Sequence, residues 1–161
     1  LDEFGPDKVR NTPISEAAIV GTAIGCSAVG MRPVAELMFD DFIFVAGDQV
    51  VNQMAKLRYM TGGQIKLPLT IRMAMGGGVS QAAQHAQCVM GMFMNVPGLK
   101  IVCPSDAYDA KGITKSAIRD DNPVLIFEHL MLYENVFEVP DEEYFVPIGK
   151  AERKLLLLVF V

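Results

Sequence analysis

Two side chains in this sequence could exchange protons near neutral pH, and each lies next to a distinctive local pattern. Glu16 begins a segment rich in small residues, where its carboxylate could act as an acid or could simply complement a helix dipole. Composition alone favours the dipole role. His85 follows the glycine-rich turn 75–80 and could transfer protons or merely cap a turn. The residue types leave both roles of the imidazole open.

Other candidate groups have simpler interpretations. The glycines at 76–78 follow a predicted strand, so their amides could face a phosphate, although a flexible turn is the simpler reading. His129, beside Glu128, is favoured as a structural histidine. The sequence has no P-loop, no G-x-S-x-G motif, no paired-cysteine zinc motif and no G-x-G-x-x-G after a strand. The enzyme classes that depend on these motifs are therefore excluded.

The scaffold for these residues is predicted to alternate between strands and helices. Helices are predicted over 15–30, 42–60, 84–94 and 107–119, and strands over 33–39, 67–73, 99–103 and 124–128. Apolar strands joined by crossover helices form mostly parallel sheets covered on both faces. We therefore expect a three-layer α/β domain with its chemistry at the carboxyl ends of the strands. The acidic, Pro-containing segment 134–147 is expected to be irregular.

Local signals refine these expectations. A hydroxyl group within 12–15 is expected to cap the first helix, and Asp40 with Asp41 to cap the second. Met38 and Phe42 are most simply apolar core anchors.

Composition narrows the function classes further. The chain has 161 residues, 51% of them hydrophobic, and a net charge of −5 with scattered Lys and Arg, which disfavours nucleic acid and anionic membranes as partners. The three cysteines lie in apolar runs, so we expect buried, reduced thiols and a reducing compartment. No apolar stretch is long enough to span a membrane. We expect one domain over 1–154, with the apolar tail 155–161 as the remnant of a missing continuation.

A series of sequence blocks resembles one protein family. The first blocks are 10–16, which reads RNTPISE, and 30–36, which reads GMRPVAE. Further blocks follow in the family's order at 48–50, 59–63, 83–85, 97–100, 109–112, 117–120 and 122–124. From about residue 4 to residue 151 the chain resembles the β subunits of 2-oxo acid dehydrogenase E1 enzymes. The resemblance implies a transketolase-like pyrimidine-binding domain.

The resemblance also implies a cofactor. In this family thiamin diphosphate lies between two subunits: the α chain holds the diphosphate and magnesium, and the β chain holds the aminopyrimidine. Glu16 matches the carboxylate that shares a proton with the pyrimidine N1′ nitrogen, which replaces the helix-dipole interpretation. Ile14, Met38 and Phe42 match positions that pack around the pyrimidine, with Phe42 as the expected stacking residue.

His85 matches the family's active-site histidine, whose implied task is to assist acyl transfer to a lipoyl group of the E2 partner. The family usually has serine after this histidine, whereas here Ala86 follows, so a hydroxyl group that would orient the imidazole is missing.

The resemblance further implies a structural potassium ion in some members. The matching positions are Leu69, Ala117, Ile118, Asp120 and Asn122. The alternative is that 120–123 forms only a helix-to-strand turn.

The implied assembly is an α2β2 E1 enzyme that decarboxylates a 2-oxo acid. Pyruvate is the first choice of substrate, and acetoin or branched-chain 2-oxo acids are the alternatives. The family's N-terminal segment and its C-terminal domain, which usually contacts E2, are expected to be missing, so this fragment alone should have no appreciable dehydrogenase activity. The expected compartment is the cytoplasm in a bacterium, or the mitochondrial matrix or a plastid in a eukaryote.

Rival interpretations remain open from the sequence. A single-chain transketolase-like or deoxyxylulose phosphate synthase-like enzyme is weakened by the blocks around His85 and Asp120. A non-catalytic partner that kept the fold is suggested only by Ala86, and an unrelated protein with an apolar binding pocket is the third alternative.

Overall fold

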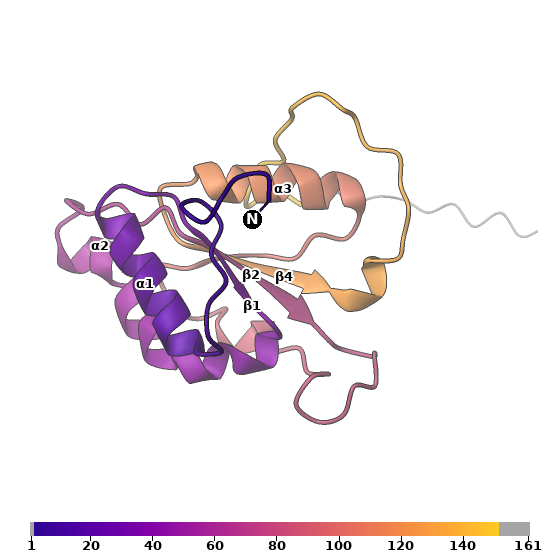
Figure 1. Cartoon of the computed structure of the whole chain (residues 1–161), viewed down its shortest axis with the longest axis horizontal. Coiled ribbons are helices and arrows are strands. Elements are labelled where there is room, and N and C mark those ends of the chain that lie inside the picture. The colour runs from indigo at the N-terminus through magenta and orange to yellow at the C-terminus, as the bar shows by residue number, and fades with distance from the viewer. Residues whose placement is uncertain (1, 152–161) are drawn as a thin grey trace, which may run out of the picture.

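The fold is built on a parallel sheet. The computed structural model describes residues 2–151. Its strands are β1 (Val34–Leu37), β2 (Thr70–Met75), β3 (Lys100–Val102) and β4 (Val124–His129). Every paired strand is parallel to its neighbour, and the order across the sheet is β1-β2-β4-β3 (Figure 1). The predicted α/β class with a parallel sheet is confirmed, with each predicted strand present and differing only at its ends.

Alternate side chains of β4 divide the core into two clusters. Leu125 and Phe127 belong to the larger cluster, whereas Val124 and Ile126 join the smaller one. Successive residues of a strand point to opposite faces, so the two clusters lie on the two sides of the sheet. The domain therefore has the three layers that the sequence predicts.

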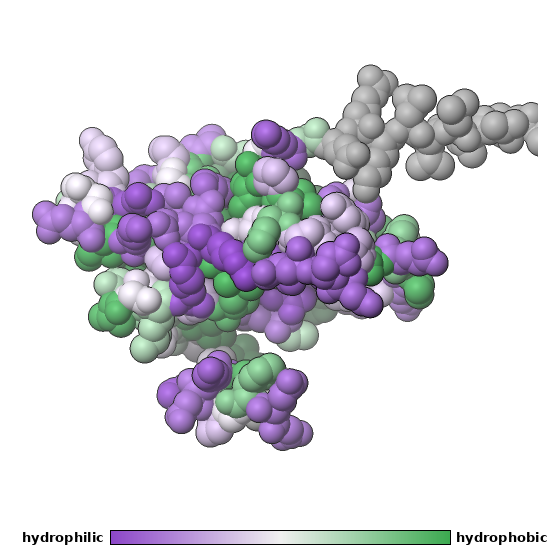
Figure 2. Space-filling view, turned by 90° about the horizontal axis from the view of Figure 1, so that it is seen from above, coloured by the Kyte–Doolittle hydropathy of each residue, from purple (hydrophilic) through white to green (hydrophobic). Residues whose placement is uncertain are grey.

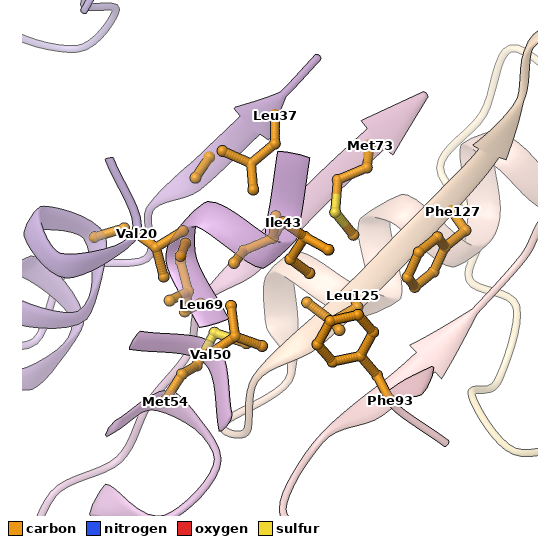
Figure 3. Packing of buried hydrophobic residues seen from close by; sticks show 14 of the residues in the cluster. Val20, Leu37, Ile43, Val50, Met54, Leu69, Met73, Phe93, Leu125 and Phe127 are labelled. Carbon is orange, nitrogen blue, oxygen red and sulfur yellow. The ribbon is translucent and has the colours of Figure 1, made fainter. Parts of the chain in front are cut away.

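The larger cluster is covered by α1 (Glu16–Ala28) and by a helical run that follows β1. This run consists of a 3₁₀ helix η1 (Asp40–Ala46), a π-helical stretch η2 (Gln49–Met54) and a short α-helix α2 (Leu57–Met60). Figure 3 shows the side chains of this cluster meeting between the helical run and the sheet. The single helix predicted over 42–60 is thus present as three pieces of different pitch.

The opposite face is covered by α3 (Ala107–Arg119). The carboxylate of Asp106 caps α3 by accepting the Asp109 N–H at 2.8 Å. The predicted irregular segment packs on this helix: the Ser116 hydroxyl donates to the Val146 carbonyl at 2.7 Å, and a β-carbon on Gly112 would come within 2.5 Å of Val146. Figure 2, which shows the molecule from above, shows hydrophobic areas interrupted by hydrophilic ones.

The helix predicted over 84–94 is wrong. Only the short 3₁₀ helix η3 (Met90–Met92) forms there, and residues 80–88 form neither helix nor strand. Ser80 and Ala82 have positive φ angles, and the Val89 N–H donates to the carboxylate of Asp40 rather than to a carbonyl one turn earlier. A distant side chain therefore replaces the hydrogen bonds that a helix would need.

The N-caps predicted for the two helical segments that cover the larger cluster, α1 and η1, are also wrong. Ser15 precedes α1 but makes no side-chain capping hydrogen bond. Phe39 occupies the cap position of η1, while Asp40 and Asp41 lie inside its first turn with no capping bond. The two carboxylates are used elsewhere, as described below.

The cysteines differ from expectation as well. All three thiols are free, but only Cys26 is half-buried, whereas Cys88 and Cys103 are exposed. The prediction of buried thiols is therefore wrong for two of the three, because apolar runs here also form loop surfaces.

Two remaining expectations concern long apolar stretches. Within 2–151, no helix is both long and apolar enough to cross a membrane. The expected tail 155–161 lies outside the described residues.

Candidate functional site

The carboxyl edge of the sheet collects most of the candidate residues. β1 leads directly into Met38 and the segment 39–42, and β2 leads into the loop 76–89, which carries His85. Carboxyl ends of parallel strands meet at one edge of a sheet. Figure 1 shows the amino end of α1, with Glu16, on the side of the molecule toward which β1 points. Three separate parts of the chain thus converge on one edge.

The apolar residues expected to surround a pyrimidine lie on the surface. The side chain of Ile14 is 95% exposed and that of Met38 is 66% exposed, while Phe42 and Glu16 are half-buried. The simpler interpretation of Met38 as a core anchor is therefore wrong. Exposed large apolar side chains beside a carboxyl group suit contact with a flat, partly polar ring better than contact with water.

The imidazole of His85 lies against two phenylalanine rings. Its ring centroid is 5.2 Å from that of Phe39 and 5.2 Å from that of Phe42, with interplanar angles of 77° and 74°. These are edge-to-face contacts at ordinary aromatic distances. They restrict the orientation of the imidazole without a hydrogen-bonding side chain.

Two buried carboxyl groups lie between those phenylalanines, and the sequence analysis missed their role. Asp40 is 0% exposed and accepts the Val89 N–H at 3.0 Å, and Asp41 is 7% exposed and accepts the Gln87 side-chain amide at 2.7 Å. Burial raises the pKa of Asp40 to about 6, and the neighbouring Asp41 carboxylate adds to the rise. A pair of acids inside an apolar run was the available signal, because acidic residues are seldom buried without a partner.

The glycine-rich turn supports the same loop by close packing. A β-carbon on Gly76 would lie 2.0 Å from the carbonyl oxygen of His85, whereas one on Gly77 would have no neighbour nearer than 3.8 Å. Gly76 is thus a point where two backbones touch. The simpler reading of a turn fits better than a phosphate cradle at this glycine, because the space beside it is filled by the chain itself.

The positions expected to hold potassium come together where α3 passes into β4. The carbonyl oxygens of Ile118 and Asp120 converge, because both accept Arg32 Nη1 at 3.1 Å. The Asp120 carboxylate accepts the Asn122 N–H at 2.9 Å and pairs with Lys100. Burial would raise the pKa of Asp120, but hydrogen bonds from Lys100 and Asn122 hold it below its usual range.

The other two carbonyls at this corner already have one partner each. The Ala117 carbonyl accepts the Asp120 N–H at 3.1 Å, and the Leu69 carbonyl accepts the Val124 N–H at 2.9 Å. A carbonyl oxygen has two lone pairs, so one hydrogen bond leaves it able to bind a cation. The other oxygens of this corner are bound by positively charged side chains: Arg32 holds the Ile118 and Asp120 carbonyls, Arg58 the Asn122 side-chain oxygen, and Lys100 the Asp120 carboxylate.

The end of β4 carries a separate polar network. Arg72 binds both carboxylate oxygens of Glu128, at 2.9 and 2.7 Å, and the Tyr133 hydroxyl donates to the same carboxylate at 2.6 Å. His129 Nδ1 accepts the Met131 N–H at 3.3 Å and so caps the 3₁₀ helix η4 (Leu130–Leu132). His129 has the structural role that the sequence favours.

The sequence of this chain is similar to one family of domains and to several characterised subunits. A family model described as "Transketolase, pyrimidine binding domain" matches residues 1–135. The chain is 49% identical to the acetoin:2,6-dichlorophenolindophenol oxidoreductase subunit beta of Bacillus subtilis, over 96% of this chain and 45% of that protein. It is 46% identical to the pyruvate dehydrogenase E1 component subunit beta of the same organism, over 94% of this chain and 47% of that protein. The chain thus spans about half the length of the curated relatives it matches.

A solved structure gives the same result for the fold. A protein described as "Split gene transketolase, inactive beta4 tetramer" superposes with a TM-score of 0.70 and 26% identity, over 91% of this chain and 44% of that one. The resemblance to E1 β subunits that the sequence blocks indicated is confirmed by the 46% identity to the pyruvate dehydrogenase E1 component subunit beta. The chain belongs to the family of transketolase-type pyrimidine-binding domains.

Proposed function

We propose that this chain forms the aminopyrimidine-binding half of a thiamin diphosphate site in the E1 component of a 2-oxo acid dehydrogenase. The observation that carries the proposal is the half-buried carboxyl group of Glu16 on the same edge as the exposed side chains of Ile14 and Met38. That combination provides one proton-sharing group within an apolar surface open to a ring.

The residues of this chain have distinct tasks in the proposal. Thiamin diphosphate, when bound, supplies the electron sink for decarboxylation. Glu16 holds a proton on its carboxyl oxygen toward the pyrimidine N1′ position. Ile14, Met38 and Phe42 contact the ring and exclude water from it, which strengthens the hydrogen bond made by Glu16.

His85 is proposed to hold a proton at the site of acyl transfer to a lipoyl group of E2. Ala86 lacks the hydroxyl group found in the family, and the edge contacts with Phe39 and Phe42 provide an orienting constraint in its place. The imidazole is therefore still held in place although the family's serine is absent.

The proposed assembly is an α2β2 enzyme, in which the α subunit supplies the diphosphate and magnesium site. A solved relative described as an inactive β4 tetramer supports the need for a second kind of chain. The proposed compartment is that of such complexes: the bacterial cytoplasm, or the mitochondrial matrix or a plastid.

Pyruvate is the proposed substrate, and acetoin is the second candidate. A β subunit of an acetoin enzyme matches this chain at 49% identity, compared with 46% for the pyruvate enzyme of the same organism. The difference is small, so turnover must be tested with pyruvate, acetoin and a branched-chain 2-oxo acid.

We also propose a potassium ion at the corner between α3 and β4. The convergence of the Ile118 and Asp120 carbonyls on the Arg32 guanidinium supports it, because a positive charge already lies between these oxygens; potassium would have to displace Arg32 from them. Leu69 and Ala117 would complete the set of oxygen ligands. The ion would fix the turn that leads into the central strand.

The first experiment is substrate turnover by the full-length β chain assembled with its α partner, with Glu16→Gln compared with the unmodified chain. Decarboxylation is measured for pyruvate and a branched-chain 2-oxo acid, and carbon–carbon cleavage for acetoin. We expect turnover of the true substrate to fall about 100-fold or more, because acid–base groups contribute on the order of 10² to 10⁴. Glu3→Gln, the same change at an exposed position, is the control and should keep full activity. A fully active Glu16→Gln enzyme would refute the proposed function.

A further inference from the structure

Segment 39–42 contacts the loop 76–89 through every one of its residues. The outer residues, Phe39 and Phe42, each place a ring 5.2 Å from the ring of His85. The inner residues, Asp40 and Asp41, bind farther along the same loop, at Val89 and Gln87. Four consecutive residues therefore hold the imidazole and the backbone that carries it.

The two inner contacts replace regular structure in the loop. Residues 80–88 form neither helix nor strand, so repeated backbone hydrogen bonds do not hold them. The Val89 N–H, which is buried, donates to Asp40 at 3.0 Å, and this bond fixes the end of the loop. A hydrogen bond to a carboxylate is stronger than one to a neutral acceptor, so a single such bond is an effective anchor.

The burial of two adjacent acids is costly, and this cost argues for a specific role. One oxygen of each carboxyl group, Oδ1 of Asp40 and Oδ2 of Asp41, is buried without a donor in the described part of the chain. A single proton shared between the two groups would satisfy both oxygens, as in other close carboxyl pairs. An apolar pair would fill the same space at lower cost but would leave the Val89 N–H unpaired.

We infer that Asp40 and Asp41 are positioning residues, which fix the loop 76–89 and thereby hold the His85 imidazole in place for acyl transfer. The inference rests on the proposed function, because it deepens the role given to His85 there. The acids do not touch the reacting atoms, and their effect passes through Val89 and Gln87. Displacement of a reacting group by about 1 Å can lower a rate on the order of 100-fold.

The test uses the assembled enzyme with four variants of the β chain. Asp40→Ala removes the acceptor of the Val89 N–H, whereas Asp40→Asn keeps an acceptor oxygen and supplies an amide proton to Asp41. Gln87→Ala removes the donor to Asp41 from an exposed position, so it should fold even where Asp40→Ala does not. Gln81→Ala, at another exposed position of the same loop, is the matched control.

Three measurements separate positioning from general stability. Acylation of a free lipoyl domain reports the step given to His85, decarboxylation with an artificial electron acceptor bypasses that step, and amide hydrogen exchange reports the order of residues 85–89. We expect Asp40→Ala and Gln87→Ala to lower kcat of lipoyl acylation about tenfold or more, with KM for the 2-oxo acid and the acceptor-linked rate nearly unchanged. Exchange at the Val89 amide should quicken in Asp40→Ala, and Asp40→Asn should restore both properties.

Other outcomes would overturn the inference. Lipoyl acylation at the unmodified rate in both Asp40→Ala and Gln87→Ala would show that the loop needs no such anchor, and so would a loss in Gln81→Ala as large as that in Gln87→Ala. Faster exchange with normal acylation would show that the acids order the loop without serving the reaction. The proposed function fails separately, if Glu16→Gln retains full activity.

Discussion

The close approach at Gly76 gives a prediction whose size follows from the geometry. In Gly76→Ala, the new β-carbon would lie 2.0 Å from the His85 carbonyl oxygen and 2.9 Å from the Ala86 α-carbon, whereas ordinary contacts begin at 3.4 Å. Both neighbours are backbone atoms and cannot rotate away, so the loop 76–89 must move by more than 1 Å. We expect lipoyl acylation to fall about 100-fold and the free energy of unfolding to fall by about 1–3 kcal/mol.

The adjacent glycine provides the control. A β-carbon on Gly77 would meet only His129 Nε2 at 3.8 Å and the Cys88 β-carbon at 3.9 Å, and neither Gly76 nor Gly77 has a positive φ angle. The two substitutions therefore change the unfolded chain in the same way and differ only in the folded state. We expect Gly77→Ala to retain activity within about twofold, because the added methyl group would make only ordinary van der Waals contacts.

The assay is steady-state acylation of a lipoyl domain by the assembled enzyme, with urea unfolding of each chain measured in parallel. Equal acylation rates for the two alanine variants would refute the reasoning, because they would show that the His85 carbonyl can retreat from Gly76 at no functional cost.

Three further predictions concern the buried and paired charges. The raised pKa of Asp40, about 6 against an ordinary 3.8, means that the folded chain binds the proton more tightly, so the free energy of unfolding should fall by about 2 kcal/mol as pH rises from 4 to 6; urea titrations should show no such fall in Asp40→Asn. Arg72→Met should cost about 2 kcal/mol at pH 7, discounted for the partial exposure of the pair. Arg72 holds the pKa of Glu128 below its ordinary 4.5 despite burial, so this cost should shrink as pH falls below that value, and an equal cost at pH 3 would contradict the pairing. Potassium chloride should raise the midpoint temperature of thermal unfolding relative to choline chloride at equal ionic strength, and Asp120→Ala should abolish the difference. An equal midpoint in the two salts for the unmodified chain would rule out the proposed ion.

The alternation of strands and helices could be predicted because it depends on local patterns. β4 opens with four consecutive buried apolar residues and β2 is apolar except at Thr70 and Arg72, as in strands covered on both faces, and α3 has both a strong apolar period and an acidic N-cap. The sheet class followed from these elements alone.

The loop 76–89 could not be predicted from local patterns. The apolar spacing within 84–94 resembles that of a helix, but Asp40, which is distant in sequence, takes the hydrogen bond of Val89. This long-range hydrogen bond also explains why the role of Asp40 and Asp41 was not predicted, since acids at the start of a helical run are typical N-caps. Both features depend on a tertiary contact, and the residues near either partner in the sequence do not include the other partner.

The exposure of Ile14 and Met38 also could not be predicted from the residues around them in the sequence. Apolar residues at a strand end or before a helix usually turn inward, and only the resemblance to a cofactor-binding family gave a reason for them to remain on the surface. Their assignment to the pyrimidine stays a prediction until a bound coenzyme is measured.

The strand order has a consequence for how this chain acquires its structure during synthesis. Of the four strands within residues 2–151, β4 is synthesised last, yet it lies between β2 and β3 and pairs with both. β1 and β2 can pair early, but the partner residues of β3, Val124 to Ile126, are made more than twenty residues after it. Sheets closed by such distant contacts form slowly, because a long loop must be ordered before the contacts that stabilise it. The edge of β2 that pairs with β4 therefore stays open from the synthesis of Met75 until β4 has been made, and an unpaired strand edge of this kind can associate with other chains.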